Sequence, residues 1–225
     1  MEGALQHTIL HGTVMEGLNA KDFTAMLRAA AVKIENAKDE LTNLDSQIGD
    51  GDHGTTMSKV MELVASTAES YSGSDLKGLF AGIGTNILNV GGGATVPLFG
   101  SFFGGFAKAE GAETDRADAA LIAEMFISGK DRLLKFSKAS LGDKTLVDAL
   151  IPAVSALKEN SADGITTMFE AAAEAAEEGS AKTKDYIAKH GRAKNLGERA
   201  IGIPDPGSVS VALMFRAFAD RVKGE

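Results

Sequence analysis

The stretch NAKDFTAMLRAAAVKIENAKDEL (19–41) decides the fold class of this 225-residue chain. Asn19 is a residue type that caps helix N-termini, and Asp22 would lie in the first turn, where a negative charge is favourable. Apolar side chains then recur every three or four residues, as on one face of a helix, at Phe23, Met26, Leu27, Ala30, Ile34 and Ala37. The spacing predicts a helix over 20–44.

Comparable patterns continue along the rest of the sequence. They predict helices near 55–70, 75–90, 97–109, 115–136, 144–158, 163–190 and 207–222, and the alanine-rich segment EAAAEAAEEG (170–179) has high helix propensity. No run of β-branched residues alternates in the manner of a strand, and no repeat or linker divides the chain. We therefore expect one all-α domain of about eight helices over 19–225, preceded by an N-terminal arm at 1–18.

Composition excludes several classes of function. The chain has no cysteine, which excludes disulfides and thiolate chemistry and suits a cytoplasmic protein. Its net charge of −8 and the lack of a Lys/Arg run argue against nucleic-acid binding. No apolar stretch approaches the length of a membrane span, and the N-terminus does not resemble a secretory signal. Self-association stays open.

The segment LDSQIGDGDHGTTM (44–57) carries the strongest chemical signal. Asp45, Asp50 and Asp52 are so close that their carboxylates repel one another unless a cation neutralises them. Mg²⁺ takes hard oxygen ligands, usually a few carboxylates together with substrate phosphates. The interleaved glycines would let the backbone turn so that the three side chains converge. A solvated acidic turn is the alternative for an isolated DGD sequence, whereas an EF-hand is excluded because Met61 stands where its twelfth-position Glu would be.

Two further segments are weaker signals when each is taken alone. In NVGGGATVPLFGSFFGGF (89–106), glycines precede a predicted helix whose N-terminus could bind an anion, but no Walker A or dinucleotide motif is present. In GRAKNLGERAIGIPDPGSVS (191–210), Arg192 and Arg199 could neutralise phosphate or form surface ion pairs. The segment GDKT (142–145) could simply begin a helix.

The remaining histidines and the phenylalanine cluster have simpler explanations. His7, His11 and His190 lack metal-ligand spacing, so we interpret them as surface or packing residues. The phenylalanines at 99, 102, 103 and 106 have helical spacing and are expected to be core residues rather than a base-stacking platform.

Four segments occur in the order seen in one known family: LDSQIGDGDHGTTM, GGGATVPLFGSF, GDKTLVDALIPA and GRAKNLGERAIGIPDPGSVS. Over roughly 20–222 the chain resembles the nucleotide-binding subunit (DhaL, DAK2-type) of dihydroxyacetone kinases. The resemblance implies an antiparallel eight-helix barrel with the nucleotide held in loops at one end. It also implies a cytoplasmic kinase subunit with bound ADP or ATP and two Mg²⁺ ions.

The resemblance also assigns site residues. Asp45, Asp50 and Asp52 match the aspartates that hold the two Mg²⁺ ions. The matching nucleotide contacts are His53, Gly54, Thr55, Thr56, Ala94, Thr95, Leu146, Arg192, Asp205, Pro206 and Gly207. Two positions depart from the usual family pattern: Val96 replaces a glycine, and Ser137, also expected to lie at the nucleotide, stands where bacterial relatives often have glycine.

The family divides the reaction between subunits. The resemblance implies a separate sugar-binding DhaK-type subunit, with a phosphohistidine protein of the phosphotransferase system as a further partner in one subclass. In that subclass ADP is a rephosphorylated coenzyme, whereas in the other ATP exchanges as a substrate. No general base for a sugar hydroxyl is identifiable here. The alternatives are an ATP-dependent kinase subunit for a tetrulose and a nucleotide-sensing module without catalytic function.

Overall fold

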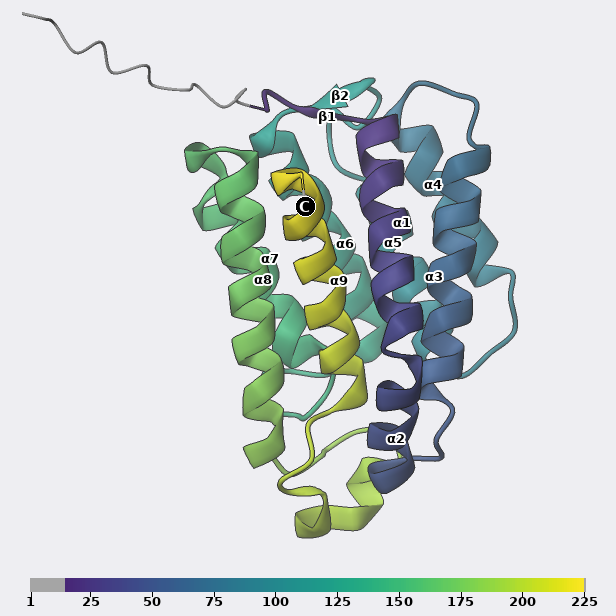
Figure 1. The fold of residues 1–225 in the computed structure, drawn as a ribbon, viewed down its shortest axis with the longest axis vertical. Helices are drawn as coiled ribbons and strands as arrows, with labels where there is room; N and C mark the ends of the chain where they lie inside the picture. The colour runs from purple at the N-terminus through teal and green to yellow at the C-terminus, as the bar shows by residue number, and fades with distance from the viewer. Residues whose placement is uncertain (1–14, 225) are drawn as a thin grey trace, which may run out of the picture.

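A computed structural model describes residues 15–224 and consists almost entirely of helices (Figure 1). The chain order is β1 (Leu18–Asn19), α1 (Ala20–Asn36), α2 (Lys38–Ile48), α3 (His53–Ser70), α4 (Leu76–Leu88), α5 (Thr95–Phe106), β2 (Arg116–Ala117), α6 (Ala119–Ser137), α7 (Val147–Glu159), η1 (Ser161–Asp163), α8 (Ile165–Lys182), η2 (Thr183–Asp185), η3 (Ala193–Ala200) and α9 (Pro206–Lys223). The all-α expectation is confirmed. His7, His11 and most of the expected N-terminal arm lie outside the described residues.

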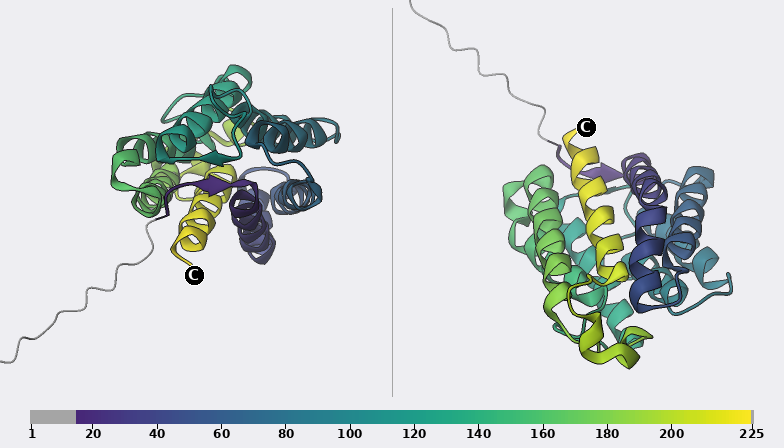
Figure 2. Two further views of the ribbon diagram at one scale, coloured as in Figure 1. Left: turned by 90° about the horizontal axis from the view of Figure 1, so that it is seen from above. Right: turned by 60° about the horizontal axis from the view of Figure 1, so that its bottom comes forward.

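The long helices form a closed antiparallel ring. Each of α1, α3, α4, α5, α6, α7, α8 and α9 packs against the next, and α9 packs back against α1. The view along the bundle shows these helices arranged around a common core (Figure 2). The chain reverses direction between successive members of the ring, whether the connection is short, as at 71–75, or long, as at 183–205. The ring accordingly has eight members, as the expected barrel requires.

The largest differences from the predicted helix boundaries occur at three of the predicted helices. The predicted helix at 20–44 is two helices, because Ala37 (φ −94°, ψ 4°) leaves helical geometry and α2 continues beyond it to Ile48. The predicted start at 115 is too early: Arg116 and Ala117 pair with Asn19 and Leu18 as two-residue strands. The predicted end at 190 is too late, since α8 ends at Lys182 and the chain becomes extended at Tyr186.

The predicted start of α1 is confirmed in detail. The Asn19 side chain accepts hydrogen bonds from the backbone N–H groups of Lys21 and Asp22, and the Asp22 carboxylate accepts one from the Asn19 N–H at 2.9 Å. This reciprocal capping box satisfies N–H groups that have no partner within the helix.

A row of phenylalanine side chains in contact with one another fills the centre of the helical barrel. The phenylalanines at 99, 102, 103 and 106 are at most 1% exposed, which confirms their predicted place in the core. Phe106 on α5 lies 4.5 Å from Phe126 on α6 and 4.8 Å from Phe80 on α4, between ring centroids. Phe126 continues the chain to Phe215 on α9. This burial couples helices that are distant in sequence.

The alternation of helices places four loops at one end of the barrel. These loops are 49–52, 89–94, 138–146 and 183–205, and α3, α5, α7 and α9 each begin where one of them ends. Figure 1 shows this end at the bottom, and the right-hand view of Figure 2 turns it toward the reader. Within residues 15–224, no helix has both the length and the apolar character needed to cross a membrane.

Candidate functional site

The three aspartates of the loop after α2 converge as predicted. Asp45 lies in the last turn of α2, Asp50 lies in the loop, and Asp52 is the residue before α3. One carboxylate oxygen from each lies within 4.8 Å of the others. Such a set of hard oxygen donors fits Mg²⁺. An acidic turn in which the side chains diverge into solvent does not have this geometry.

Hydrogen bonds to the backbone orient Asp45. Its Oδ2 accepts from the N–H of Asp52 at 2.9 Å and from the N–H of His53 at 3.1 Å. These donors belong to the start of α3, whose dipole favours negative charge there. Asp45 therefore joins the end of α2 to the start of α3 and holds the loop in a closed turn.

Asp50 forms an ion pair with Arg192. The two side chains are 38% and 65% exposed, so water reaches both and the pair adds little to stability. The ion pair brings the loop after α8 across to the acidic loop after α2. Arg192 thus lies beside the aspartates, where its guanidinium could move to a phosphate oxygen.

A cleft of about 650 Å³ opens beside the three aspartates. Its volume is in the range of small-molecule sites. The predicted residues that line it are Asp45, Asp50, Asp52, His53, Thr56, Ala94, Thr95, Ser137, Leu146, Arg192, Asp205, Pro206 and Gly207. The structure therefore brings together side chains from all four loops at this end of the barrel.

Gly54 and Thr55 do not line the cleft. Gly54 packs against α2, and a Cβ atom added there would lie 2.1 Å from the Lys38 carbonyl oxygen. The packing of α3 against α2 therefore requires a glycine at position 54. The roles of Gly54 and Thr55 at the nucleotide remain predictions from the resemblance.

His53 is a buried residue beneath the acidic loop. Its Nε2 lies 2.8 Å from the Ser210 hydroxyl on α9. Burial lowers the pKa of His53 by disfavouring the imidazolium, although the Asp45 carboxylate opposes this shift. His53 is therefore neutral near pH 7 in this arrangement and ties α3 to α9.

The glycine-rich segment forms the approach to α5. Ala94 is the N-cap residue of α5 without a side-chain cap, and Thr95 begins the helix at the cleft. The N-terminus of a helix attracts anions because its first N–H groups lack intrahelical partners. Val96, which departs from the family pattern, is 6% exposed, does not line the cleft and packs near Gly92, where an added Cβ would lie 2.5 Å from the Val96 Cγ2.

The opposite wall of the cleft is largely apolar. It includes Leu98, Phe136, Ala139, Leu146 and Val147, which come from α5, α6, the loop 138–146 and the start of α7. Ser137, the second departure, also lies here, and its hydroxyl accepts a hydrogen bond from the Ala139 N–H at 3.1 Å. The cleft thus has a charged end and an apolar end.

Asp205 is the N-cap residue of α9 and lines the cleft. Its side chain accepts from the Ser208 N–H at 2.7 Å, and Pro206 follows in the first turn. Desolvation raises the pKa of Asp205 to about 7, against the opposing effects of this hydrogen bond and of the Lys144 ammonium. Perturbed carboxylates of this kind are common at functional sites.

Sequence reasoning missed the role of Lys144. It sits in a left-handed conformation (φ 57°) and is only 2% exposed, and its ammonium donates to the carbonyls of Thr183 and Ile203 at 2.5 and 2.6 Å. It therefore ties the loop before α7 to both ends of the loop before α9. The positive φ of this lysine has no signal in the sequence.

Asp143 and Asp148 complete this junction. Asp143 forms an ion pair with Lys189 at 2.8 Å and a hydrogen bond with His190 at 3.1 Å, and the lysine, with backbone and histidine hydrogen bonds, lowers its pKa to about 2. Asp148 accepts from the N–H groups of Gly142 and Thr145. His190, expected to be a surface or packing residue, lines the cleft. GDKT is accordingly a structural junction beside the cleft.

Comparison with known proteins agrees with these observations. Residues 47–220 match the family model described as DAK2 domain. The chain is 36% identical over 181 residues to the ADP-binding subunit DhaL of PEP-dependent dihydroxyacetone kinase from Escherichia coli (strain K12), covering 80% of this chain and 86% of that protein. It is 37% identical over 205 residues to the ADP-binding subunit DhaL of PEP-dependent dihydroxyacetone kinase 2 from Listeria innocua, covering 89% and 94% respectively.

Larger kinases contain a matching region. An L-erythrulose 1-kinase from Mycolicibacterium smegmatis is 32% identical over 216 residues, which cover 90% of this chain but 36% of that enzyme. The crystal structure of the dihydroxyacetone kinase of C. freundii superposes with a TM-score of 0.72 at 24% identity, covering 98% of this chain and 38% of that one. At this identity the superposition establishes the fold. By its match over 47–220 and its 36–37% identity to curated subunits over most of their length, this chain belongs to the DAK2 domain family.

Proposed function

We propose that this chain is the Mg-ADP-binding, phosphoryl-transferring subunit of a dihydroxyacetone kinase that acts with a separate sugar-binding subunit. The observation that carries the proposal is the convergence of Asp45, Asp50 and Asp52 at the charged end of the cleft. The family relationship supports the same activity, because the similar proteins of comparable length are named ADP-binding subunits of this kinase.

The charged end of the cleft suits a polyphosphate held by divalent metal. The three carboxylates would hold two Mg²⁺ ions, which supply neutralisation of phosphate charge when bound. Thr95 at the start of α5 would present backbone N–H and hydroxyl donors, and Arg192 would contribute a cation from the opposite side. Phosphoryl transfer depends mainly on such positioning and electrostatic stabilisation.

The apolar end of the cleft suits an adenine ring. Leu98, Phe136 and Leu146 provide surface against which a planar base can be buried. A nucleotide spanning both ends would place its phosphates at the aspartates and its base against α6 and α7.

The partner surface would be the rim of the cleft. Among the described residues, most of the exposed large apolar side chains lie on α4, α6 and the loops of this end: Leu88, Val90, Phe136, Leu141, Ile187 and Ile201. An exposed apolar rim around a site is typical of a protein interface. We place the sugar-binding subunit here because the transferred phosphoryl group must leave through this opening.

The decisive experiment is a set of thermal melts on protein stripped of bound nucleotide. The conditions are buffer, Mg²⁺, ADP with chelator, and Mg²⁺ with ADP. We expect strong stabilisation only when both ligands are present, because ADP alone meets three carboxylates and Mg²⁺ prefers phosphate co-ligands. Equal stabilisation by ADP with chelator would show that the acidic loop does not anchor the phosphates.

Reconstitution separates the kinase from a nucleotide-sensing module. The chain alone is expected not to phosphorylate dihydroxyacetone, whereas addition of a sugar-binding subunit should give activity. A Leu141→Ser variant should keep Mg-ADP affinity but need more partner for half-maximal activity, since Leu141 is 56% exposed on the rim and does not line the cleft. Binding without activity in any reconstitution would favour the sensing module.

The tetrulose alternative rests on the 32–35% identity to the two erythrulose kinases of Mycolicibacterium smegmatis. Reconstitution with dihydroxyacetone and erythrulose in parallel distinguishes the substrates. Exchange of bound nucleotide during turnover distinguishes an ATP substrate from an ADP coenzyme that a phosphohistidine protein of the phosphotransferase system rephosphorylates.

A further inference from the structure

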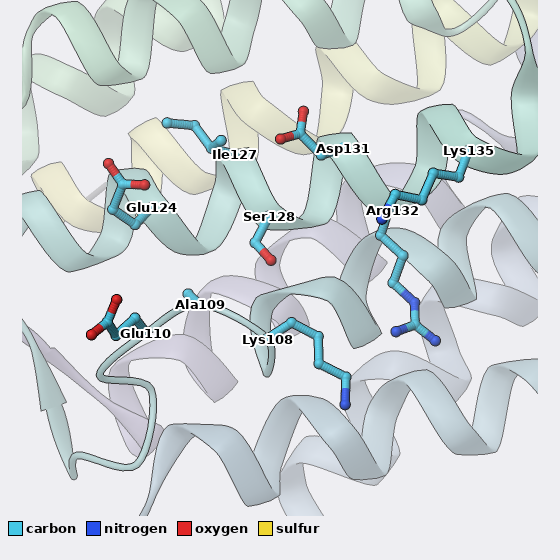
Figure 3. A pocket seen from close by; sticks show the side chains of 9 residues that line it. All are labelled: Lys108, Ala109, Glu110, Glu124, Ile127, Ser128, Asp131, Arg132 and Lys135. Atoms are coloured by element: carbon cyan, nitrogen blue, oxygen red, sulfur yellow. The ribbon is translucent and has the colours of Figure 1, made fainter.

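A second cavity, of about 670 Å³, lies away from the four loops, between the end of α5 and the middle of α6 (Figure 3). Small residues bring α5 and α6 into close contact beside this groove. Gly105 and Gly129 meet backbone to backbone, since a Cβ added to Gly105 would lie 2.6 Å from the Gly129 Cα, and the Ser128 hydroxyl donates to the Gly105 carbonyl at 2.8 Å. The groove itself is lined by side chains of α6 and by residues 108–110, which follow α5.

Charges are separated along the groove. Figure 3 shows Lys108 and Arg132 extending on one side, with Glu110 and Glu124 at the other end. Glu124 is paired with Lys158 at 2.5 Å, and the neighbouring Asp131 is paired with Lys130 at 3.1 Å. These carboxylates are neutralised by cations that stand outside the groove.

The cations of the groove have no such neutralisation. Within residues 15–224, neither Lys108 nor Arg132 has an ion pair or a side-chain hydrogen bond, and Lys135 also lines the groove. The Nε of Arg132 is buried from solvent and has no hydrogen-bond partner. A ligand in the groove cannot reach this covered nitrogen, but within residues 15–224 the terminal guanidinium nitrogens of Arg132 also lack a protein acceptor that a ligand could supply.

An anion supplies that acceptor. A guanidinium binds phosphate or carboxylate oxygens through paired N–H donors, and lysines add compact positive charge. Three cations line this groove, and together they match the double charge of a phosphate monoester better than the single charge of a carboxylate. At the other end, Glu110 and the Ser128 hydroxyl can accept or share hydrogen bonds with ligand hydroxyl groups.

We propose that the groove between α5 and α6 binds a small hydroxylated phosphate monoester, with its phosphate against Lys108, Arg132 and Lys135. This site is separate from the cleft with the three aspartates, and no residue lines both. The positively charged part of the groove contrasts with the net charge of the chain, which is −8. The site does not depend on the proposed kinase activity.

The test is titration with glycerol 3-phosphate and, separately, inorganic phosphate, followed by amide chemical shifts. The main cleft is first saturated with Mg-ADP so that phosphate binding there does not contribute, and sodium chloride at matched ionic strength controls for charge screening. We expect saturable shifts at residues 105–110 and 124–135, with glycerol 3-phosphate binding more tightly than inorganic phosphate. Equal affinities for the two ligands would mean that the site recognises only the phosphate group, which would contradict the proposed contacts to ligand hydroxyl groups.

Two variants and a control complete the experiment. Arg132→Gln and Lys108→Gln should each weaken binding at least about tenfold, the loss expected for one charge-assisted contact. Lys21→Gln removes the same charge from an exposed position on α1 outside the groove and should leave affinity unchanged. Lys108 follows α5, so its variant remains informative if the change on α6 disturbs folding. Absence of saturable shifts, equal weakening in all three variants, or binding only of an acidic peptide would overturn the proposal.

Discussion

Replacing Asp50 by asparagine separates metal binding from folding better than changing either neighbouring aspartate. Asp45 accepts two backbone hydrogen bonds, and Asp52 is the residue from which α3 begins, so changes there also disturb the helix start. Asp50 has only its exposed ion pair with Arg192. Exposed pairs contribute about 0–1 kcal/mol, and loss of one negative charge also relieves repulsion among the three carboxylates.

The expected magnitudes follow from mass action. Mg-ADP at about 1,000 times its dissociation constant adds roughly 4 kcal/mol to the free energy of unfolding. A domain of this size gains roughly 2–4 °C for each kcal/mol, so the wild-type melting temperature should rise by about 8–16 °C. If Asp50→Asn weakens binding about a hundredfold, the same ligand concentration adds only about 1.4 kcal/mol, or roughly 3–6 °C.

The assay is thermal unfolding with and without Mg-ADP, with circular dichroism to confirm unchanged helix content. Without ligand, the variant should melt within about 4 °C of the wild type. Glu113→Gln is the matched control, because it removes one exposed carboxylate, paired with Lys77, outside the cleft. The control should keep the full Mg-ADP shift. Full protection of Asp50→Asn by Mg-ADP would refute the assignment of Asp50 as a metal ligand.

Three further predictions concern the framework of the site. The pKa of Asp205 is raised to about 7, so the folded state holds a proton that the unfolded state has lost, and the stability of the wild type falls as pH rises from about 4 through 7. Asp205→Asn should therefore become increasingly stable relative to the wild type across that range, and a difference in melting temperature that does not depend on pH would contradict this. Lys144→Met should lower the free energy of unfolding by about 2–4 kcal/mol, because the carbonyls of Thr183 and Ile203 lose a charged donor. Amide hydrogen exchange should also accelerate across 183–205, and unchanged exchange in this loop would show that the lysine does not hold it. Gly84→Ala should destabilise the protein by more than about 2 kcal/mol in denaturant unfolding, since its Cβ would lie 2.5 Å from the Gly104 Cα. Gly82→Ala, with nothing within 4 Å of the added Cβ, should be neutral or stabilising by about 0.5–1 kcal/mol. Equal effects of the two variants would show that α4 and α5 do not meet at Gly84.

The sequence by itself determined the helical class, the core face of α1 and the acidic loop. These features are local: helix periodicity, the Asn19 cap and the spacing of three aspartates act over a few residues. The resemblance added the barrel and the identity of the loops. Helix ends were less accurate, because the break at Ala37 has no glycine or proline to mark it, and the start of α6 is displaced by strand pairing with Leu18.

Only the tertiary structure decided which residues meet. The burial of Lys144, its contacts across 183–203 and the place of His190 at the cleft depend on loops that are far apart in sequence. The same is true of the groove at Lys108 and Arg132, which exists because α5 and α6 approach at glycines. Local patterns encode helices, but contacts between separate loops arise from how the whole barrel packs, which single-sequence periodicity does not contain.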